Sequence, residues 1–195
     1  MSRRTGILAF AAAALLLGAC GAKSLREGES PFPAGRPVFA DEAGAPLAGL
    51  PDAPEPLRLV LLDFPWCPPC AEVLRDVGRA SGAFPPGAVR LYRILFDRER
   101  ILSAGGVREA PPLRPAPAPP DAAAADPERL PTTTLTALSS PFREEFRLER
   151  APVLLLLGRD GKVRKRWIGY SPALAASVTS EVTRSADALP KPPGK

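Results

Sequence analysis

The stretch Trp66-Cys67-Pro68-Pro69-Cys70 carries the strongest signal for both the fold and the chemistry of this chain. An apolar run that is typical of a strand, Leu59 to Phe64, comes directly before it, and a pattern that is typical of a helix follows it. A C-x-x-C pair between a strand and a helix is typical of a dithiol redox centre. The sequence therefore predicts that this pair is the reactive centre of the protein.

The expected geometry gives each cysteine a different role. If Cys67 is the last residue before a helix, its sulfur faces unpaired N–H groups and the positive end of the helix dipole, which favour the thiolate. We therefore expect Cys67 to be the nucleophile and Cys70 to be the resolving thiol that releases a bound client. Pro68 and Pro69 fit the first helical turn and are expected to border the client-binding surface. Pro69 also removes an N–H that could bond the Cys67 sulfur, which favours a reductant over a strong oxidant.

Other uses of the cysteine pair have less support in the sequence. A structural zinc site needs four ligands, whereas the chain has no histidine and only Cys20 besides this pair. A haem attachment site needs a histidine after the second cysteine, where Ala71 stands. An inert structural disulfide stays open as an alternative, although a bond that closes so short a loop stabilises little.

The composition predicts one domain of ordinary size with extended flanks. The 195 residues are 45% hydrophobic, and the 26 prolines and 16 glycines are concentrated outside the periodic segments. The formal net charge is +5, and it falls to +3 without Arg3 and Arg4. Because this balance is only modestly basic, nucleic acid is not an expected partner. We expect a monomer without a cofactor or metal.

The N-terminus predicts export to the cell envelope. Arg3 and Arg4 precede an apolar run over 7–17 that would be about 16 Å long as a helix, too short for a bilayer core of about 30 Å. Residues 1–19 therefore predict a signal peptide, and residues 20–37 a flexible tether. The small residues before Cys20 resemble the lipobox of bacterial lipoproteins, which implies a lipid anchor on Cys20 facing the periplasm, in the cytoplasmic or the outer membrane. An ordinary secretory signal is the alternative.

Hydrophobic patterns predict one domain over residues 38–189. A strand over 57–64, a helix running to about residue 80 and a strand over 89–96 form a β-α-β unit. The other expected elements are a weak N-terminal hairpin within 38–56, a strand over 132–138, a short helix over 141–148, strands over 153–157 and 163–168, and a final helix opened by Ser171 and Pro172 that ends near Leu189. The pair Asp160-Gly161 predicts a hairpin turn between the last two strands.

Two segments lack such patterns. Residues 107–131 hold eight prolines and a run of four alanines, which predicts a disordered, proline-rich insertion on the surface. Residues 190–195 predict a frayed tail.

Taken together, the strand before the cysteine pair, the β-α-β unit and the terminal Ala151-Pro152 hairpin and helix resemble the thioredoxin superfamily, and more narrowly its TlpA/ResA-like membrane-tethered thiol-disulfide oxidoreductases. The resemblance implies an α/β fold with a central mixed sheet flanked by helices. It also implies that Pro152 is cis and lies against the disulfide, and that the backbone of Ala151 pairs with a client.

The chain departs from this pattern before the cysteines. The connection from Asp63 to Cys67 is about two residues shorter than is usual in the family. Asp63 either takes the place of the family's buried acid, which accepts the proton of the second cysteine, or turns outward at the strand end. Trp66 is expected to pack beside the dithiol and, by resemblance, to contact partners.

The resemblance implies an enzyme that exchanges a disulfide with cysteines of client proteins, as a reductant that resembles those of cytochrome c maturation and receives electrons from a membrane thiol reductant. Two alternatives belong to other classes. A Cu(I)-binding metallochaperone would be expected to have further soft ligands, but Met1 is the only methionine. A redox-silent adaptor that only binds clients would not need the intact cysteine pair.

Overall fold

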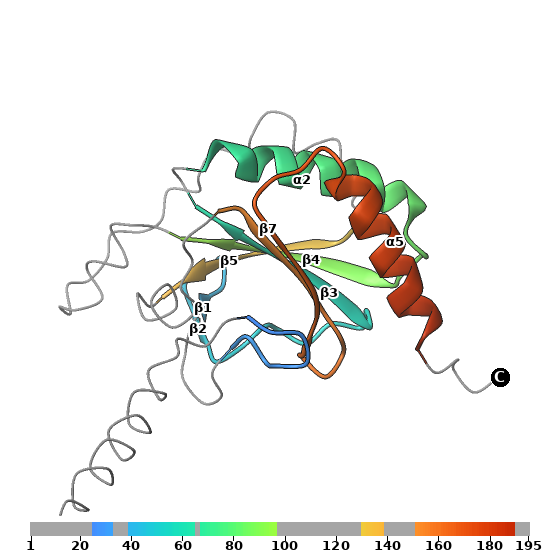
Figure 1. Cartoon of the computed structure of the whole chain (residues 1–195). Coiled ribbons are helices and arrows are strands. Elements are labelled where there is room, and N and C mark those ends of the chain that lie inside the picture. The colour runs from blue at the N-terminus through green and yellow to red at the C-terminus, as the bar shows by residue number, and fades with distance from the viewer. Residues whose placement is uncertain (1–24, 33–38, 65–66, 97–129, 139–150, 190–195) are drawn as a thin grey trace, which may run out of the picture.

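The computed structural model describes residues 25–32, 39–64, 67–96, 130–138 and 151–189. In chain order the elements are β1 (Phe39–Ala40), β2 (Pro46–Leu47), β3 (Leu57–Asp63), α2 (Pro68–Ala80), a 3-10 turn (Ser81–Ala83), β4 (Val89–Leu95), β5 (Thr132–Ala137), β6 (Val153–Leu157), β7 (Val163–Ile168) and α5 (Leu174–Asp187). The strands form one mixed sheet in the order β2-β1-β5-β4-β3-β6-β7. Figure 1 shows α2 and α5 together on one face of this sheet. The predicted α/β class and central mixed sheet are confirmed.

Several predictions fall outside the described residues. They concern the signal peptide, the lipidation of Cys20, the position of Trp66, the helix over 141–148, the insertion as far as residue 129, and the tail over 190–195. Within the part of the chain that the structure describes, no helix is long and apolar enough to cross a bilayer.

The centre of the sheet follows from the apolar run of β3. This strand pairs in parallel with β4 and antiparallel with β6, and both of its faces are covered. Leu57, Leu59 and Leu61 belong to the buried cluster on the side of α2 and α5, whereas Val60 and Leu62 belong to the cluster on the opposite face. A strand with two buried faces needs apolar side chains at successive positions, which is the pattern seen in the sequence.

The two helices bury one apolar stripe each. On α2 the stripe contains Val73 and Val77, and on α5 it contains Leu174, Val178 and Val182. These residues recur at helical spacing and meet the leucines of β3 and β6 in one cluster.

The start of α5 differs from the prediction. The helix begins at Leu174 with Ala173 as its N-cap, not at Pro172. The N–H of Leu174 donates to the Ser171 carbonyl at 2.9 Å, and the N–H of Ala173 donates to the Ser171 hydroxyl at 3.3 Å. Ser171 therefore closes a separate turn, and the helix starts two residues after Pro172.

The end of the predicted insertion also belongs to the folded domain. Leu130 is buried among the residues of the helix-covered face. The carbonyl of Pro131 accepts the N–H of Leu91, which aligns β5 beside β4. The predicted end of the insertion at residue 131 is therefore wrong by two residues. The pattern that predicts a strand begins only at residue 132, after the buried Leu130.

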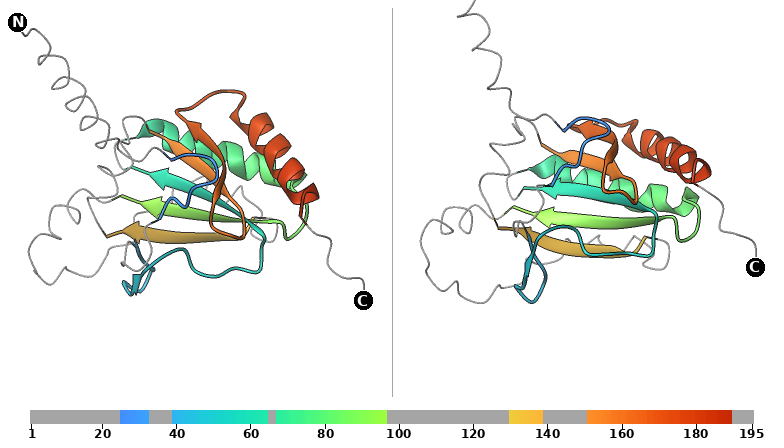
Figure 2. Two further views of the ribbon diagram at one scale, coloured as in Figure 1. Left: turned by 60° about the horizontal axis from the view of Figure 1, so that its bottom comes forward. Right: turned by 90° about the horizontal axis from the view of Figure 1, so that it is seen from below.

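On the face of the sheet away from the helices, residues 25–32 form a segment that we call the strap. The strap runs beside β7 in both views of Figure 2. Leu25 is only 4% exposed and joins the buried cluster of this face. The N–H of Gly28 donates to the Val163 carbonyl at 2.7 Å, the N–H of Val163 donates to the Glu29 carbonyl at 2.9 Å, and the Arg166 guanidinium donates to the Leu25 carbonyl at 2.9 Å.

The strap corrects the prediction of a continuous flexible tether over 20–37. Its backbone is hydrogen-bonded to an edge strand, so this part of the chain is docked, and the packed unit begins at or before Leu25 instead of at residue 38. The apolar residues of the strap, Leu25, Pro31 and Phe32, form no periodic pattern, which is why the sequence does not reveal it.

A partly buried ion pair fastens the loop before β3 to the sheet. Arg90 donates to both carboxylate oxygens of Glu55, at 2.9 and 3.0 Å, and to the Thr133 hydroxyl at 3.3 Å. Hydrogen bonding from Arg90 holds the pKa of the Glu55 carboxyl below its usual value. Nearby, the Tyr92 hydroxyl donates to the Pro51 carbonyl at 2.8 Å, and burial raises the pKa of this phenol.

Candidate active site

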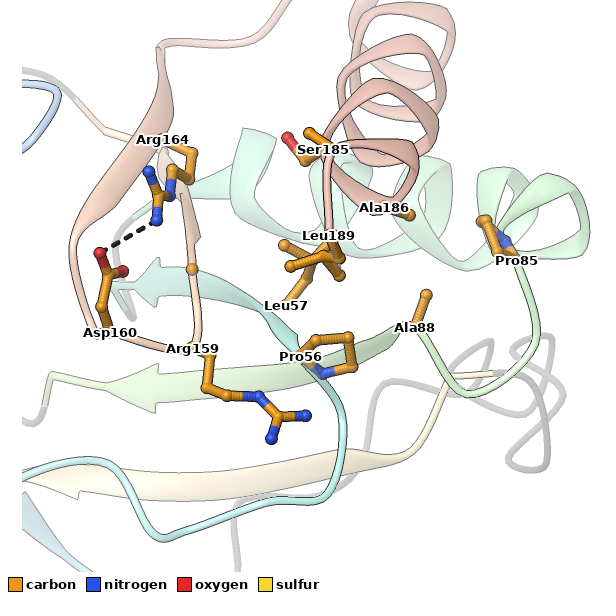
Figure 3. Close-up of a pocket in the computed structure, with 12 residues that line it drawn as sticks. Pro56, Leu57, Pro85, Ala88, Arg159, Asp160, Arg164, Ser185, Ala186 and Leu189 are labelled. Carbon is orange, nitrogen blue, oxygen red and sulfur yellow. Dashed lines mark hydrogen bonds and ion pairs between the residues drawn. The ribbon is translucent and has the colours of Figure 1, made fainter. Parts of the chain in front are cut away.

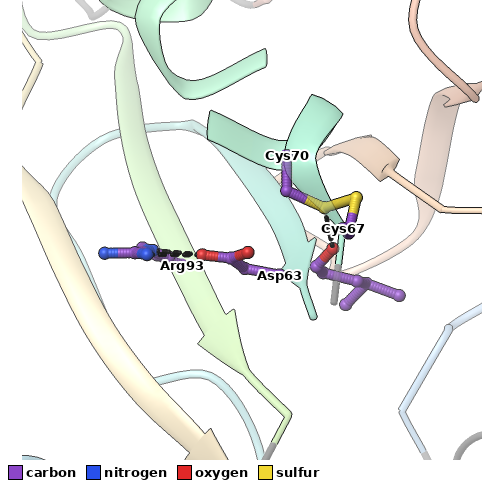
Figure 4. Close-up of a disulfide and its surroundings, with 5 residues drawn as sticks. Asp63, Cys67, Cys70 and Arg93 are labelled. Atoms are coloured by element: carbon purple, nitrogen blue, oxygen red, sulfur yellow. Dashed lines mark hydrogen bonds and ion pairs between the residues drawn. A yellow bond between two sulfur atoms is a disulfide. The ribbon is translucent and has the colours of Figure 1, made fainter. Parts of the chain in front are cut away.

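The two cysteines form a disulfide at the start of α2 (Figure 4). Cys67 is the N-cap residue, Pro68 and Pro69 occupy the first helical turn, and Cys70 lies within that turn. Their Cα atoms are 5.4 Å apart. Cys67 is 9% exposed and Cys70 is 2% exposed. The predicted placement of the pair is confirmed, and the leading cysteine is the more accessible one.

The backbone around the Cys67 sulfur offers few hydrogen-bond donors. Pro68 and Pro69 have no N–H, and the N–H of Cys70 donates to the Cys67 carbonyl at 2.9 Å. The Cys67 side chain accepts no capping hydrogen bond. A thiolate at this N-cap would therefore benefit from the helix dipole but not from the donor that an N-cap side chain usually meets at the second helical residue.

The inner sulfur lies in apolar surroundings. The Cys70 sulfur is 4.0 Å from the Leu62 carbonyl oxygen at the end of β3. The same buried cluster contains Phe64 and Phe96, whose rings stack with their centroids 4.6 Å apart. Such an environment shields Cys70 from external thiols and suits a residue that reacts only with its neighbour Cys67.

Pro152 lies at the same end of the sheet as the disulfide. The Ala151–Pro152 peptide bond is cis, as the family resemblance implies. The next residue, Val153, pairs with Leu62, whose carbonyl contacts the Cys70 sulfur. Ala151 packs against the buried cluster that includes both cysteines. Two segments more than eighty residues apart in the sequence thus meet at one site.

Asp63 ends β3 and is buried, so it does not turn outward. Arg93 on the neighbouring strand β4 donates through Nε to an Asp63 carboxylate oxygen at 2.6 Å. In Figure 4 the carboxylate points toward Arg93 and not toward the two sulfurs. The structure therefore provides a buried acid near the dithiol whose charge is matched by an arginine.

Arg93 is a site residue that sequence reasoning missed. The sequence places it in a strand and leaves its inward position open. Its partner depends on the parallel register, in which Arg93 lies opposite Leu61 and therefore diagonally next to Asp63. A basic residue at an inward position of a buried strand is the signal that could have indicated a buried acid opposite it.

The loop after β7 borders the same end of the sheet. The N–H of Gly169, which has φ +80°, donates to the Pro152 carbonyl at 2.8 Å. The Tyr170 hydroxyl donates to the buried Asp76 carboxylate of α2 at 3.1 Å, and this hydrogen bond raises the pKa of the phenol. Ile168 and Tyr170 are 49% and 41% exposed. They present apolar surface next to the site, and the sequence alone did not single them out.

The structure also has a pocket of about 860 Å³, shown in Figure 3, that lies away from the dithiol. Its lining includes Leu57 at the start of β3, Ala88 just before β4, and Arg159 from the turn between β6 and β7. The dithiol follows the opposite end of β3. The pocket therefore takes no part in the chemistry of the cysteines. Among the described residues no group of three histidine, cysteine or acidic side chains could hold a metal ion.

Neither the protein-family models nor the curated protein sequences give a match to this chain. Solved structures do match. A thioredoxin-like protein from Porphyromonas gingivalis is 15% identical, with 81% of this chain and 93% of that chain covered and a TM-score of 0.54. The thioredoxin domain of a thiol-disulfide oxidoreductase from Bacteroides vulgatus is 18% identical, with 82% and 99% covered and a TM-score of 0.52. The chain has the thioredoxin-like fold.

A third match is a putative thiol:disulfide interchange protein DsbE from Chlorobium tepidum, which is 15% identical, with 84% of this chain and 99% of that chain covered and a TM-score of 0.51. At these identities the similarity concerns the fold. In this thioredoxin-like chain the roles of the site residues therefore rest on their own geometry, namely the N-cap disulfide, the cis proline beside it and the buried acid next to them.

Proposed function

We propose that this chain is a thiol-disulfide oxidoreductase that exchanges the Cys67–Cys70 dithiol or disulfide with cysteines of client proteins. The observation that carries the proposal is a disulfide between a helix N-cap and the first helical turn, next to the Ala151-Pro152 segment. A disulfide between residues three apart closes a very short loop and adds little to the stability of the folded state. A purely structural role therefore would not explain why the chain has this disulfide.

In the reducing direction the reaction has two exchanges. The Cys67 thiolate attacks a sulfur of the client disulfide, forms a mixed disulfide and releases the first client cysteine as a thiolate. The Cys70 thiolate then attacks the Cys67 sulfur, closes the internal disulfide and releases the second client cysteine. The client gains two electrons and two protons, and the enzyme dithiol loses them. A membrane thiol reductant that reduces Cys67–Cys70 completes the cycle.

Each residue around the cysteine pair has a proposed role in the reaction. Ala151 is proposed to hydrogen-bond an extended client backbone, as an added strand would. Pro68, Pro69 and Trp66 are proposed to border the bound client. Asp63 is proposed to accept the Cys70 proton; its carboxylate, which faces Arg93 in the disulfide form, would turn toward the sulfur to do so.

The location of the enzyme is part of the proposal. The lipobox-like sequence before Cys20 supports a lipid anchor and an extracytoplasmic position, in the cytoplasmic or the outer membrane. Such a compartment exposes exported proteins to disulfide formation, which creates a need for a reductant such as that of cytochrome c maturation. The absence of an N–H at Pro68 and Pro69 supports this direction, because it leaves the reduced form less stabilised.

Reduction of insulin disulfides by dithiothreitol, with and without the purified protein, tests the proposal. We expect the wild-type chain to accelerate the reduction and Cys67→Ser to abolish the acceleration. A control variant, Arg75→Ala on α2, should keep it, because among the described residues this side chain pairs with its helix neighbour Glu72 alone. If the wild-type chain and Cys67→Ser give the same rate, the proposed activity is wrong.

A further inference from the structure

The strap determines where on the domain a chain anchored at Cys20 would join it. We propose that strand β7 and the strap form the side of the domain that lies against an anionic membrane surface, so that the dithiol is held close to the bilayer. This inference rests on the proposed lipid anchor at Cys20. It deepens the proposed function because it says which partners the dithiol can reach.

The first support is the length of chain between the anchor and the domain. Leu25 is buried and its carbonyl is bonded by Arg166, so the chain is held to the domain at this residue. Cys20 precedes Leu25 by five residues, which span at most about 17 Å when fully extended. A tether that stayed free as far as residue 38 could reach about 60 Å. The docked strap therefore keeps the β7 edge near the headgroups.

The second support is the charge of this edge. The turn before β7 and β7 itself carry five basic residues and one acid: Arg159, Asp160, Lys162, Arg164, Lys165 and Arg166. The strap adds Arg26, Glu27 and Glu29, which leaves an excess of three positive charges over both segments. Lys165 pairs with Glu27 at 3.5 Å, and Arg164 pairs with Asp160 at 3.0 Å, so these two acids offset only part of the basic charge. A basic edge of this kind is attracted to anionic lipids.

The third support is the pair of exposed apolar side chains that follows the basic stretch. Ile168 and Tyr170 are the large hydrophobic residues that stay exposed in the described part of the chain. Tyr170 has its hydroxyl fixed to Asp76, which leaves its ring at the surface. An aliphatic residue and a tyrosine next to basic side chains suit the boundary between headgroups and acyl chains.

The edge and the dithiol are close together. In the sheet order β3 is two positions from β7, which corresponds to about 10 Å at the usual strand spacing. Ile168 pairs with Val153, Val153 pairs with Leu62, and the Leu62 carbonyl contacts the Cys70 sulfur. A domain that lies on its β7 edge therefore presents the dithiol at headgroup level, where it meets thiols of membrane-embedded proteins before those of freely diffusing ones.

Energy transfer from tryptophan to a dansyl-labelled lipid headgroup tests this orientation. The chain has two tryptophans, so Trp66→Phe leaves Trp167 of β7 as the donor. The lipidated full-length protein is reconstituted in vesicles of phosphatidylcholine with phosphatidylglycerol and, separately, of phosphatidylcholine alone. We expect stronger transfer in the anionic vesicles. Raising the salt from about 0.1 M to about 1 M should remove the difference, because the Debye length falls from about 10 Å to about 3 Å.

Two charge-reversal variants distinguish the edge from the rest of the surface. One basic residue near an anionic surface changes the ratio of membrane-bound to unbound domain by about fivefold. Lys162→Glu with Arg164→Glu should therefore lower the ratio of domains that lie against the membrane to domains that do not by roughly 25-fold or more. The control, Arg75→Glu, reverses an arginine on α2 that pairs with Glu72, and should leave transfer unchanged. None of the three side chains is buried, so these variants should fold.

The outcomes separate the two proposals. If the protein floats with vesicles but transfer is equal in both lipids, or falls equally in the control, the orientation is wrong and the anchor stands. If the protein does not float with vesicles, and its mature N-terminus carries no lipid, both the anchor and the orientation are overturned, whereas the redox activity is tested separately by insulin reduction.

Discussion

Replacing Pro69 with alanine should make the disulfide a stronger oxidant. An N-cap side chain usually accepts a hydrogen bond from the N–H of the second or third helical residue. In this chain the second residue is Pro69, which has no N–H, and the third is Cys70, whose N–H already bonds the Cys67 carbonyl. Pro69→Ala restores one donor that points toward the Cys67 sulfur and does so without moving the buried core.

The size of the effect follows from the charge of the acceptor. A hydrogen bond to a charged group contributes about 1.5–3 kcal/mol. The bond would stabilise the thiolate of the reduced form and have little effect on the uncharged disulfide. Because about 1.4 kcal/mol corresponds to 30 mV for a two-electron couple, the reduction potential should rise by roughly 30–60 mV.

The assay is equilibration of the purified protein with dithiothreitol or glutathione redox buffers, with the reduced fraction measured by thiol alkylation. Pro68→Ala is the matched control, because it restores an N–H only at the first helical residue, which an N-cap side chain does not usually bond. We expect a shift for Pro69→Ala that is clearly larger than that for Pro68→Ala. An unchanged or lowered potential for Pro69→Ala would show that a missing backbone donor does not set the redox properties of this site.

Three further predictions concern stability and are measured by urea unfolding. Leu155→Ala, in the fully buried centre of β6, should lower the free energy of unfolding by about 2–5 kcal/mol. Leu25→Ala should cost about 2–3 kcal/mol and expose the strap amides to hydrogen exchange, although the strap lies before the predicted domain. Glu55→Gln should cost about 1 kcal/mol at neutral pH, because Arg90 loses a charged partner. Since Arg90 lowers the Glu55 pKa in the folded state, this contribution is present above the usual value of 4.5 and is lost as the pH falls through the lowered pKa.

Each of these predictions has a clear contrary outcome. Lys162→Ala, at an exposed position just before β7, is the control for Leu155→Ala and should change stability by less than about 0.5 kcal/mol. A Leu25→Ala protein as stable as the wild type would mean that the strap is not part of the cooperative unit. A constant difference between Glu55→Gln and wild type from neutral to acidic pH would contradict the charge-dependent role of Glu55.

Much of the fold could be predicted because local patterns and tertiary packing agree. The run from Leu59 to Leu62 is apolar at successive positions since both faces of β3 are covered, and such a run admits few other interpretations. The Asp160-Gly161 turn was visible because its glycine needs a positive φ, which it has at +71°. The cysteine pair was informative because its chemistry requires the strand before it and the helix after it.

The features that could not be predicted depend on contacts between residues that are far apart in the sequence. Whether Asp63 turns inward is decided by Arg93 on the next strand, and their approach follows from the parallel register. The strap is held by backbone hydrogen bonds to Val163 and by apolar side chains such as Leu25 and Phe32, which form no periodic pattern. The start of α5 shifted because Ser171 closes a turn of its own, and an isolated serine-proline pair is compatible with both arrangements.

Trapping of mixed disulfides tests the central claim most directly. The lipidated full-length chain is prepared with Cys70→Ser or with Cys67→Ser, exposed to an envelope extract, and its disulfide-linked partners are identified by mass spectrometry. The roles assigned to the two sulfurs predict that Cys70→Ser accumulates partners linked through Cys67, whereas Cys67→Ser, which leaves the buried sulfur, accumulates few or none. Equal trapping by the two variants, or none by either, would contradict the account.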